Sequence, residues 1–149
     1  MKYHDGLMLI RFFAQQMANR LKDRLLPQLL ILIPSHPHRL RQRGYNQDWE
    51  LTKDLSSQLN IPARNDILMR IRNTAPQTSL PYSQRKQNIK RAFNVSKITI
   101  PQHIALIDDV LTTGHTANVA AKALRQAGAH QIELWTIARK IRHHQWFFR

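Results

Sequence analysis

The sequence predicts an α/β fold in which a parallel sheet carries helices on both faces. An apolar run at 29–33 lies between two prolines, and a second run at 104–107 ends at two aspartates. Such short apolar runs are typical of strands that are buried on both sides. The second run is followed by an alanine-rich helical segment at 117–127 and by a third apolar segment at 132–138. A strand, a helix and a strand of these lengths form a parallel unit with a right-handed crossover.

The remaining elements are predicted from the spacing of apolar residues and from helix-breaking residues. Apolar residues at helical spacing predict a first helix over 7–26, which Pro27 ends, and Gly128 is placed to stop the helix at 117–127. The other expected segments are a loop at 34–46, a helix at 48–59, a short strand at 67–69, a loop at 72–83 and one or two helical turns at 85–92. The length of 149 residues fits one domain over 1–149.

Composition and charge narrow the classes of function. The chain has no cysteine, which excludes disulfides, thiolate zinc sites, iron–sulfur clusters and cysteine nucleophiles. The histidine pairs at 36 and 38 and at 143 and 144 have no acidic neighbours, so we expect no zinc there. The net charge of +14 predicts attraction to polyanions, and the alternative is a solvated basic surface. Because the longest clean apolar run, at 29–33, is far shorter than the ~20 residues of a spanning helix, we expect a cytoplasmic protein with no membrane partner.

The residues that point to chemistry follow the predicted strand at 104–107. Two adjacent carboxylates, Asp108 and Asp109, precede a turn of sequence Thr-Thr-Gly-His-Thr and a helix. Ligands of open parallel sheets bind beyond the carboxyl ends of the strands, and a helix N-terminus binds anions. Gly114 allows a positive φ and close approach of a phosphate, and the carboxylates can accept hydrogen bonds from sugar hydroxyls or hold a hydrated Mg²⁺. A simply capped helix is the alternative, but it does not explain two neighbouring like charges.

This segment resembles a known family. Residues 104–116, Ile-Ala-Leu-Ile-Asp-Asp-Val-Leu-Thr-Thr-Gly-His-Thr, are similar to the thirteen-position phosphoribosyl pyrophosphate (PRPP) motif of the type I phosphoribosyltransferases. Residues 34–47 and 76–93 resemble the ComF competence-protein branch of that superfamily, and the resemblance runs from about residue 3 to 139. It implies the type I phosphoribosyltransferase fold for the single domain. Members of that branch open with a cysteine-rich zinc-binding segment, which we expect this cysteine-free chain to lack.

The resemblance also implies roles for individual residues. The expected catalytic residues, which contact the ribose hydroxyls and hold Mg²⁺ through water, are Asp108 and Asp109. The expected 5′-phosphate site is Thr112, Thr113, Gly114, His115 and Thr116, and the expected pyrophosphate site is Ser35, His36, Arg39 and Arg43. Residues 71–86 are the expected flexible loop, in which Arg85 and Lys86 would neutralise the leaving group. For these cations the alternatives are a solvated basic loop and an ordered helix start.

Two functions follow from these residues. The first is a transferase that binds PRPP with Mg²⁺ as cofactor, moves the phosphoribosyl group to an acceptor and displaces pyrophosphate. The second is a non-catalytic competence or DNA uptake factor that uses the same scaffold to bind nucleic acid or protein. The expected partners are PRPP or pyrophosphate, with single-stranded DNA and a second copy of the chain left open. The aromatic residues at 146–148 could stack on unpaired bases, or close the core or a subunit interface.

Overall fold

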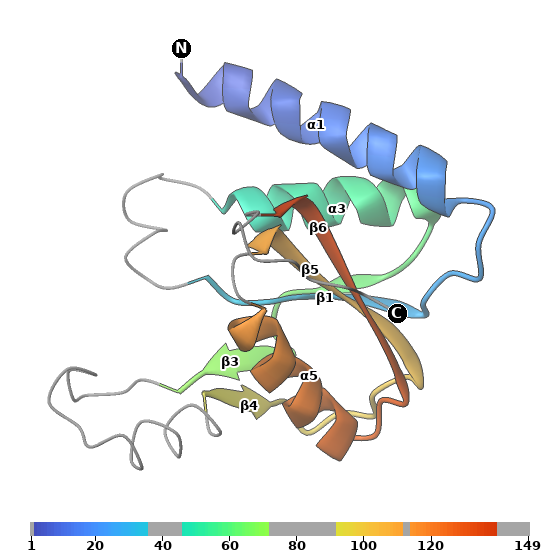
Figure 1. The fold of residues 1–149 in the computed structure, drawn as a ribbon, viewed down its shortest axis with the longest axis vertical. Helices are drawn as coiled ribbons and strands as arrows, with labels where there is room; N and C mark the ends of the chain where they lie inside the picture. Colours follow the sequence, from blue (N-terminus) through green and yellow to red (C-terminus); the bar gives the residue numbers. More distant parts are fainter. Residues whose placement is uncertain (1, 36–45, 72–91, 112–113, 140–149) are drawn as a thin grey trace, which may run out of the picture.

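The computed structural model describes residues 2–35, 46–71, 92–111 and 114–139 (Figure 1). In chain order the elements are α1 (Lys2–Leu21), β1 (Leu29–Leu32), α3 (Gln47–Leu59), β2 (Ala63–Arg64), β3 (Leu68–Arg70), β4 (Phe93–Val95), β5 (His103–Leu111), α5 (His115–Gln126) and β6 (Gln131–Arg139). Strands β1, β2, β5 and β6 form a parallel sheet in the order β2-β1-β5-β6. Strands β3 and β4 form a separate antiparallel pair.

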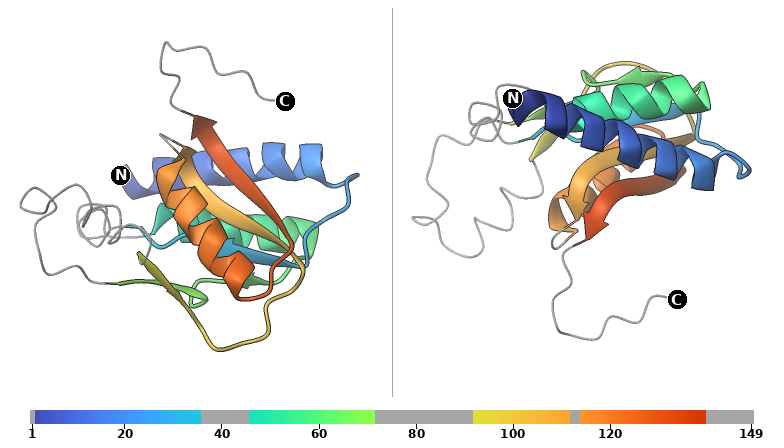
Figure 2. Two further views of the ribbon diagram at one scale, coloured as in Figure 1. Left: turned by 60° about the horizontal axis from the view of Figure 1, so that its bottom comes forward. Right: turned by 90° about the horizontal axis from the view of Figure 1, so that it is seen from above.

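Helices cover both faces of the parallel sheet. Helices α1 and α3 lie on one face, and α5 lies on the other, beside the β3–β4 pair (Figures 1 and 2). The unit β5-α5-β6 is the predicted strand–helix–strand, and β5 and β6 pair in parallel from His103 with Gln131 to Leu111 with Arg139. The predicted α/β class, with a parallel sheet between helices, is therefore confirmed.

Two hydrophobic cores explain why the central strands are continuously apolar. Leu30 and Ile107 belong to the core under α1 and α3, whereas Ile31 and Leu106 belong to the core under α5 and the β3–β4 pair. Successive side chains of a strand point to opposite faces, so a strand between two cores needs apolar residues at every position. Each such buried Leu or Ile contributes about 1.5–3 kcal/mol relative to its exposed state.

Element ends differ from the sequence predictions where the sheet decides them. The first helix spans Lys2–Leu21 rather than 7–26, because the chain must already reach the sheet at Gln28, whose N–H donates to the His103 carbonyl (2.8 Å). Asp5 in the first turn favours the earlier start through the helix dipole. Strand β5 extends past 104–107 because β6 continues to pair with it through Asp108–Thr136 and Val110–Ala138. The two aspartates therefore lie within the last four residues of the strand rather than after it.

Two further differences concern short segments. Strands β2 and β4 were not predicted, since two and three residues are too few to show an alternating pattern. Helix α5 begins at His115 rather than 117, because Gly114 (φ 73°) ends the preceding turn and caps the helix. Gly128, with φ 116°, has the positive φ expected of a helix stop. The predicted loop at 72–83 and nearly all of the segment at 85–92 lie outside the described residues.

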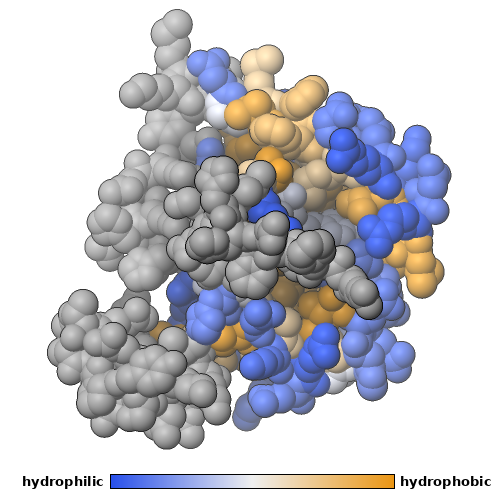
Figure 3. Space-filling view, in the orientation of Figure 1, coloured by the Kyte–Doolittle hydropathy of each residue, from blue (hydrophilic) through white to orange (hydrophobic). Residues whose placement is uncertain are grey.

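Exposed apolar side chains lie on several elements of the described residues, α1 among them. Apolar side chains gather over α1 (Figure 3), where Met8, Leu9 and Phe12 are exposed. In the part of the chain that the structure describes, no helix combines the length and the apolar character needed to cross a membrane.

Candidate functional site

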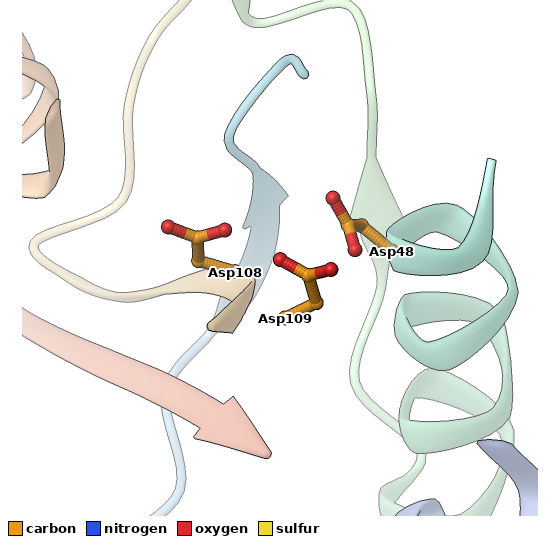
Figure 4. A group of neighbouring side chains, drawn as sticks. All are labelled: Asp48, Asp108 and Asp109. Carbon is orange, nitrogen blue, oxygen red and sulfur yellow. The ribbon is translucent and has the colours of Figure 1, made fainter. Parts of the chain in front are cut away.

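Three carboxylates meet at the carboxyl-terminal edge of the parallel sheet. Asp108 and Asp109 are carried by the end of β5, and Asp48 comes from the first turn of α3 (Figure 4). One oxygen from each of the three side chains lies within 4.8 Å of the others. We call these residues the carboxylate cluster. Asp108 and Asp109 were predicted site residues, whereas Asp48 was not.

Helix α3 holds Asp48 by its backbone and by its side chain. Asn46 caps the helix, and its Oδ1 accepts hydrogen bonds from the N–H groups of Asp48 (3.1 Å) and Trp49 (3.2 Å). The Ser35 hydroxyl, just beyond β1, donates to Asp48 Oδ2 (2.8 Å). Asp48 is only 5 % exposed, so its orientation is defined by these contacts rather than by solvent. An aspartate after an Asn cap is ordinary at a helix start, which is why the sequence did not mark it as a site residue.

The cluster perturbs the ionisation of Asp108. Burial is the largest cause, and the negative charges of Asp48 and Asp109 add to it, so the pKa of Asp108 rises to about 6. Neighbouring like charges of this kind are relieved by a proton or by a cation. Three carboxylate oxygens are the ligand type that a hard divalent cation such as Mg²⁺ prefers, so the donor set fits that ion.

Gly114 forms the turn between β5 and α5. It is the N-cap of α5, its φ is 73°, and among the residues that the structure describes no side chain makes a capping hydrogen bond there. The N–H of Asn118 donates to the Gly114 carbonyl (2.9 Å), which starts the helix. The first N–H groups of a helix have no acceptor within it and lie at the positive end of its dipole, so this turn is suited to an anion. A cap made by a threonine side chain, the alternative weighed from the sequence, is not what the structure has.

The structure places some of the predicted site residues and leaves others undescribed. Ser35 lies beside Asp48, His115 is exposed and Thr116 is half-buried in the first turn of α5. Outside the described residues are Thr112, Thr113, His36, Arg39, Arg43, Arg85 and Lys86. Asp48 is the residue that sequence reasoning missed.

Comparison with known proteins identifies the family of the fold. A family model described as phosphoribosyl transferase domain matches residues 50–145. Among solved structures, the allosteric regulatory enzyme of purine biosynthesis aligns with a TM-score of 0.57 at 15 % identity, over 86 % of this chain and 25 % of that one. The hypoxanthine phosphoribosyl transferase of Trypanosoma cruzi aligns with a TM-score of 0.54 at 13 % identity, over 92 % of this chain and 74 % of that one. These structures share the fold.

Curated relatives are more similar in sequence. Competence protein F of Haemophilus influenzae is 40 % identical over 131 residues, which cover 86 % of this chain and 57 % of that protein. Competence protein ComFC of Streptococcus pneumoniae is 31 % identical over 138 residues, with 93 % and 60 % covered. DNA utilization protein YhgH of Escherichia coli is 32 % identical over 124 residues, with 83 % and 55 % covered. The chain therefore spans little more than half the length of these relatives.

The parallel sheet, the acidic pair on β5 and the family match all agree. The chain therefore belongs to the phosphoribosyl transferase domain family, in the branch of the competence protein F relatives.

Proposed function

We propose that this chain binds PRPP together with Mg²⁺ at the carboxyl ends of β1 and β5, and transfers the phosphoribosyl group to an acceptor with release of pyrophosphate. One observation carries the proposal: Asp108 and Asp109 lie in the last part of β5, and Gly114 starts α5 five residues after Asp109 in the chain. Carboxylates for vicinal hydroxyls and backbone donors for a phosphate are thus adjacent, and a ribose 5-phosphate needs both. Membership of the family supports the assignment.

In this proposal each part of the site has one task. The turn at 112–116 binds the 5′-phosphate, and Asp108 and Asp109 accept hydrogen bonds from the ribose hydroxyls. The cations of the loop after β1, Arg39 and Arg43, bind pyrophosphate with Ser35 and His36. Arg85 and Lys86 neutralise the leaving group further.

The three carboxylates of the cluster would also act on the metal ion and on the charge of the ribose ring. When Mg²⁺ is bound, it neutralises charge on the pyrophosphate, and Asp48, Asp108 and Asp109 are the residues that would hold it, directly or through water. In the reaction the bond from C1 of the ribose to pyrophosphate breaks, and the acceptor forms a new bond to C1. The ring then carries partial positive charge, which the neighbouring carboxylates stabilise electrostatically.

Thermal stability in the presence of ligand tests the proposal. Ligand at 100 times its dissociation constant adds about 2.7 kcal/mol to the free energy of unfolding. For a domain of about 150 residues this raises Tm by roughly 5–10 °C. We expect this rise with PRPP and Mg²⁺ together, and its loss in the double variant Asp108→Asn, Asp109→Asn. Asp54→Asn removes one carboxylate of α3 outside the cluster, and this control should keep the shift.

The experiment has a clear negative outcome. An unchanged Tm of the wild-type protein at millimolar PRPP and Mg²⁺ overturns the proposal. Where the shift is present, release of pyrophosphate from PRPP with a panel of acceptors identifies the acceptor.

The second candidate function is binding of single-stranded DNA without catalysis. Two observations favour it: the net charge of +14, and the relatives named for competence and DNA utilization.

A further inference from the structure

Arg70 connects the β3–β4 pair to the end of β1. Its Nε donates a hydrogen bond to the carbonyl oxygen of Pro34 (2.9 Å), two residues beyond β1. Its guanidinium carbon also lies 5.4 Å from the centre of the Phe93 ring, and Phe93 is its cross-strand partner. Phe93 is buried in the core between the sheet and α5. The exposed guanidinium therefore has two contacts that favour this position, one with a buried ring and one with the carbonyl that it binds.

This hydrogen bond restricts the orientation of Ser35. The Pro34 carbonyl lies in one rigid peptide plane with the nitrogen and Cα of Ser35. The proline ring fixes φ of Pro34, so rotation about its ψ is the soft motion that turns this plane. Turning the plane would move the carbonyl oxygen away from Arg70 Nε. Arg70 thus restricts the position of the Ser35 Cα, from which the side chain extends.

Ser35 in turn defines the orientation of Asp48. Its hydroxyl donates to Asp48 Oδ2 (2.8 Å), while Asn46 holds only the backbone of Asp48. Three carboxylates within 4.8 Å repel one another, so the Asp48 side chain keeps its place in the cluster only while something holds it there. Two hydrogen bonds and one peptide plane therefore join Arg70 to the carboxylate cluster.

We propose that Arg70 is a positioning residue for the carboxylate cluster: by fixing the Pro34–Ser35 peptide, it keeps the Ser35 hydroxyl where it orients Asp48. What the cluster binds rests on the proposed function, but the positioning itself does not. The β3–β4 pair, which contributes no residue to the cluster, would thereby have a role in the site.

The first test is a double-mutant cycle on the affinity for PRPP in the presence of Mg²⁺, measured by calorimetry. Residues that position a metal-binding side chain typically change affinity by 10–100-fold, so Arg70→Ala should weaken binding about tenfold. If Arg70 acts through Ser35, then Arg70→Ala with Ser35→Ala binds no more weakly than Ser35→Ala alone. If the losses of affinity in the two single variants instead multiply in the double variant, the proposal is wrong. So would a lowered Tm of Arg70→Ala with unchanged affinity, since that result describes a merely structural arginine.

Arg64→Ala is the matched control. Arg64 is an exposed arginine of β2 whose Nε donates to Asp66 (2.7 Å), and it is not a member of the cluster. Its replacement by alanine lowers the net charge by the same amount as Arg70→Ala. We expect its affinity for PRPP to equal that of the wild type. A loss as large as that of Arg70→Ala would show a general effect of charge and would contradict the positioning role.

The second test needs no ligand, and it separates this inference from the proposed function. The carboxyl carbon of Asp48, observed by NMR in the unliganded protein, should shift to a common new position in Arg70→Ala and Ser35→Ala, and stay unchanged in Arg64→Ala. If the wild type fails to bind PRPP but these shifts occur, the proposed function is wrong and the positioning role stands. If the Asp48 resonance of Arg70→Ala equals that of the wild type, the positioning role is wrong, whatever the protein binds.

Discussion

Asp108 is a residue whose charged form is destabilised by its surroundings in the folded protein. It lies near the end of β5, where burial and the charges of Asp48 and Asp109 raise its pKa to about 6. An unfolded chain would hold this proton only up to about the ordinary aspartate value. Near neutral pH the charged form of Asp108 therefore lowers the free energy of unfolding of the protein. A bound cation relieves this repulsion, so the same arrangement that costs stability favours the proposed ligand.

The sign of this effect predicts how stability depends on pH. The folded-state pKa is raised, so Asp108 contributes stability at pH values below the unfolded pKa of 3.8 and loses it as pH rises through about 6. Asp108→Asn removes the charge, so the variant should be about 1 kcal/mol more stable than the wild type at pH 8, after allowance for partial solvent screening. Near pH 4 the two proteins should be almost equally stable. Urea unfolding at both pH values measures the difference.

Asp54→Asn is the control for this prediction. Asp54 lies on α3 outside the carboxylate cluster, so its replacement should not reproduce the gain at high pH. An Asp108→Asn protein that is no more stable than the wild type at pH 8 would show that the cluster does not destabilise the carboxylate.

At the scale of elements, the first turn of α3 combines a helix cap with a residue of the carboxylate cluster. Asn46 satisfies two backbone N–H groups of that turn, and one of them belongs to Asp48. The Thr52 hydroxyl donates to the Asp48 carbonyl from one turn further along (2.5 Å). The helix cap thus places a carboxylate of the site, and a change in the cap should be felt in both stability and binding.

Asn46→Ala tests this double role. Loss of an Asn cap costs about 1 kcal/mol of stability, within a range of 0.5–2. Because the Asp48 N–H loses its anchor, we also expect weaker binding of PRPP with Mg²⁺. Asn46→Ser keeps a good capping side chain and should restore most of both properties. Urea unfolding and calorimetric titration measure the two effects, and full binding by a destabilised Asn46→Ala protein would separate the cap from the site.

At the scale of the whole molecule, charge is the dominant property. Lys and Arg number 23 against 9 acidic residues, and three of those acids form the carboxylate cluster. A cationic protein with a local negative site attracts polyanions broadly while holding a divalent cation at one place. This distribution suits a phosphorylated sugar with Mg²⁺, and it is also compatible with a nucleic acid on another part of the surface.

The second candidate function predicts a characteristic dependence on salt. If about four to six phosphates are contacted, the affinity for single-stranded DNA should fall with a log–log slope of about −3 to −4, from the rule of −0.7 per contact. Binding should not depend on sequence. Deletion of 142–149, which carry two arginines and three aromatic residues, should reduce both the affinity and the slope. Titration of labelled oligonucleotides at several salt concentrations measures both.

The contrary outcomes are equally definite. Absence of binding at about 50 mM salt leaves the net charge without this explanation and favours the transferase function. If the deletion lowers Tm and leaves DNA binding unchanged, the aromatic residues close the core or an interface instead. Competition between PRPP and DNA would indicate that both use the arginines at 39–43.

Particular residues show how far the sequence predicted this structure. The run at 29–33 predicted a doubly buried strand correctly, because two cores require an apolar residue at every position. The turn at Gly114 was predicted with its positive φ, since only glycine adopts that conformation readily. Strands β2 and β4 were missed because their few residues pair only through partners distant in the chain. The predicted end of the first helix was five residues too late, because the sheet rather than Pro27 decides where the chain leaves α1.

The sequence by itself determined the parallel sheet, the β5-α5-β6 unit and the acidic pair beside a glycine turn. Each of these depends on local pattern: the apolar period, helix propensity and the backbone freedom of one residue. Only the tertiary structure decided that Asp48 completes the cluster and that Arg70 reaches it through Pro34 and Ser35. These contacts join residues far apart in the chain. They form because α3 packs against β1 and β5 and because the β3–β4 pair shares a core with the sheet. The spacing of apolar residues indicates that an element has a buried face, but it does not indicate which other element that face contacts.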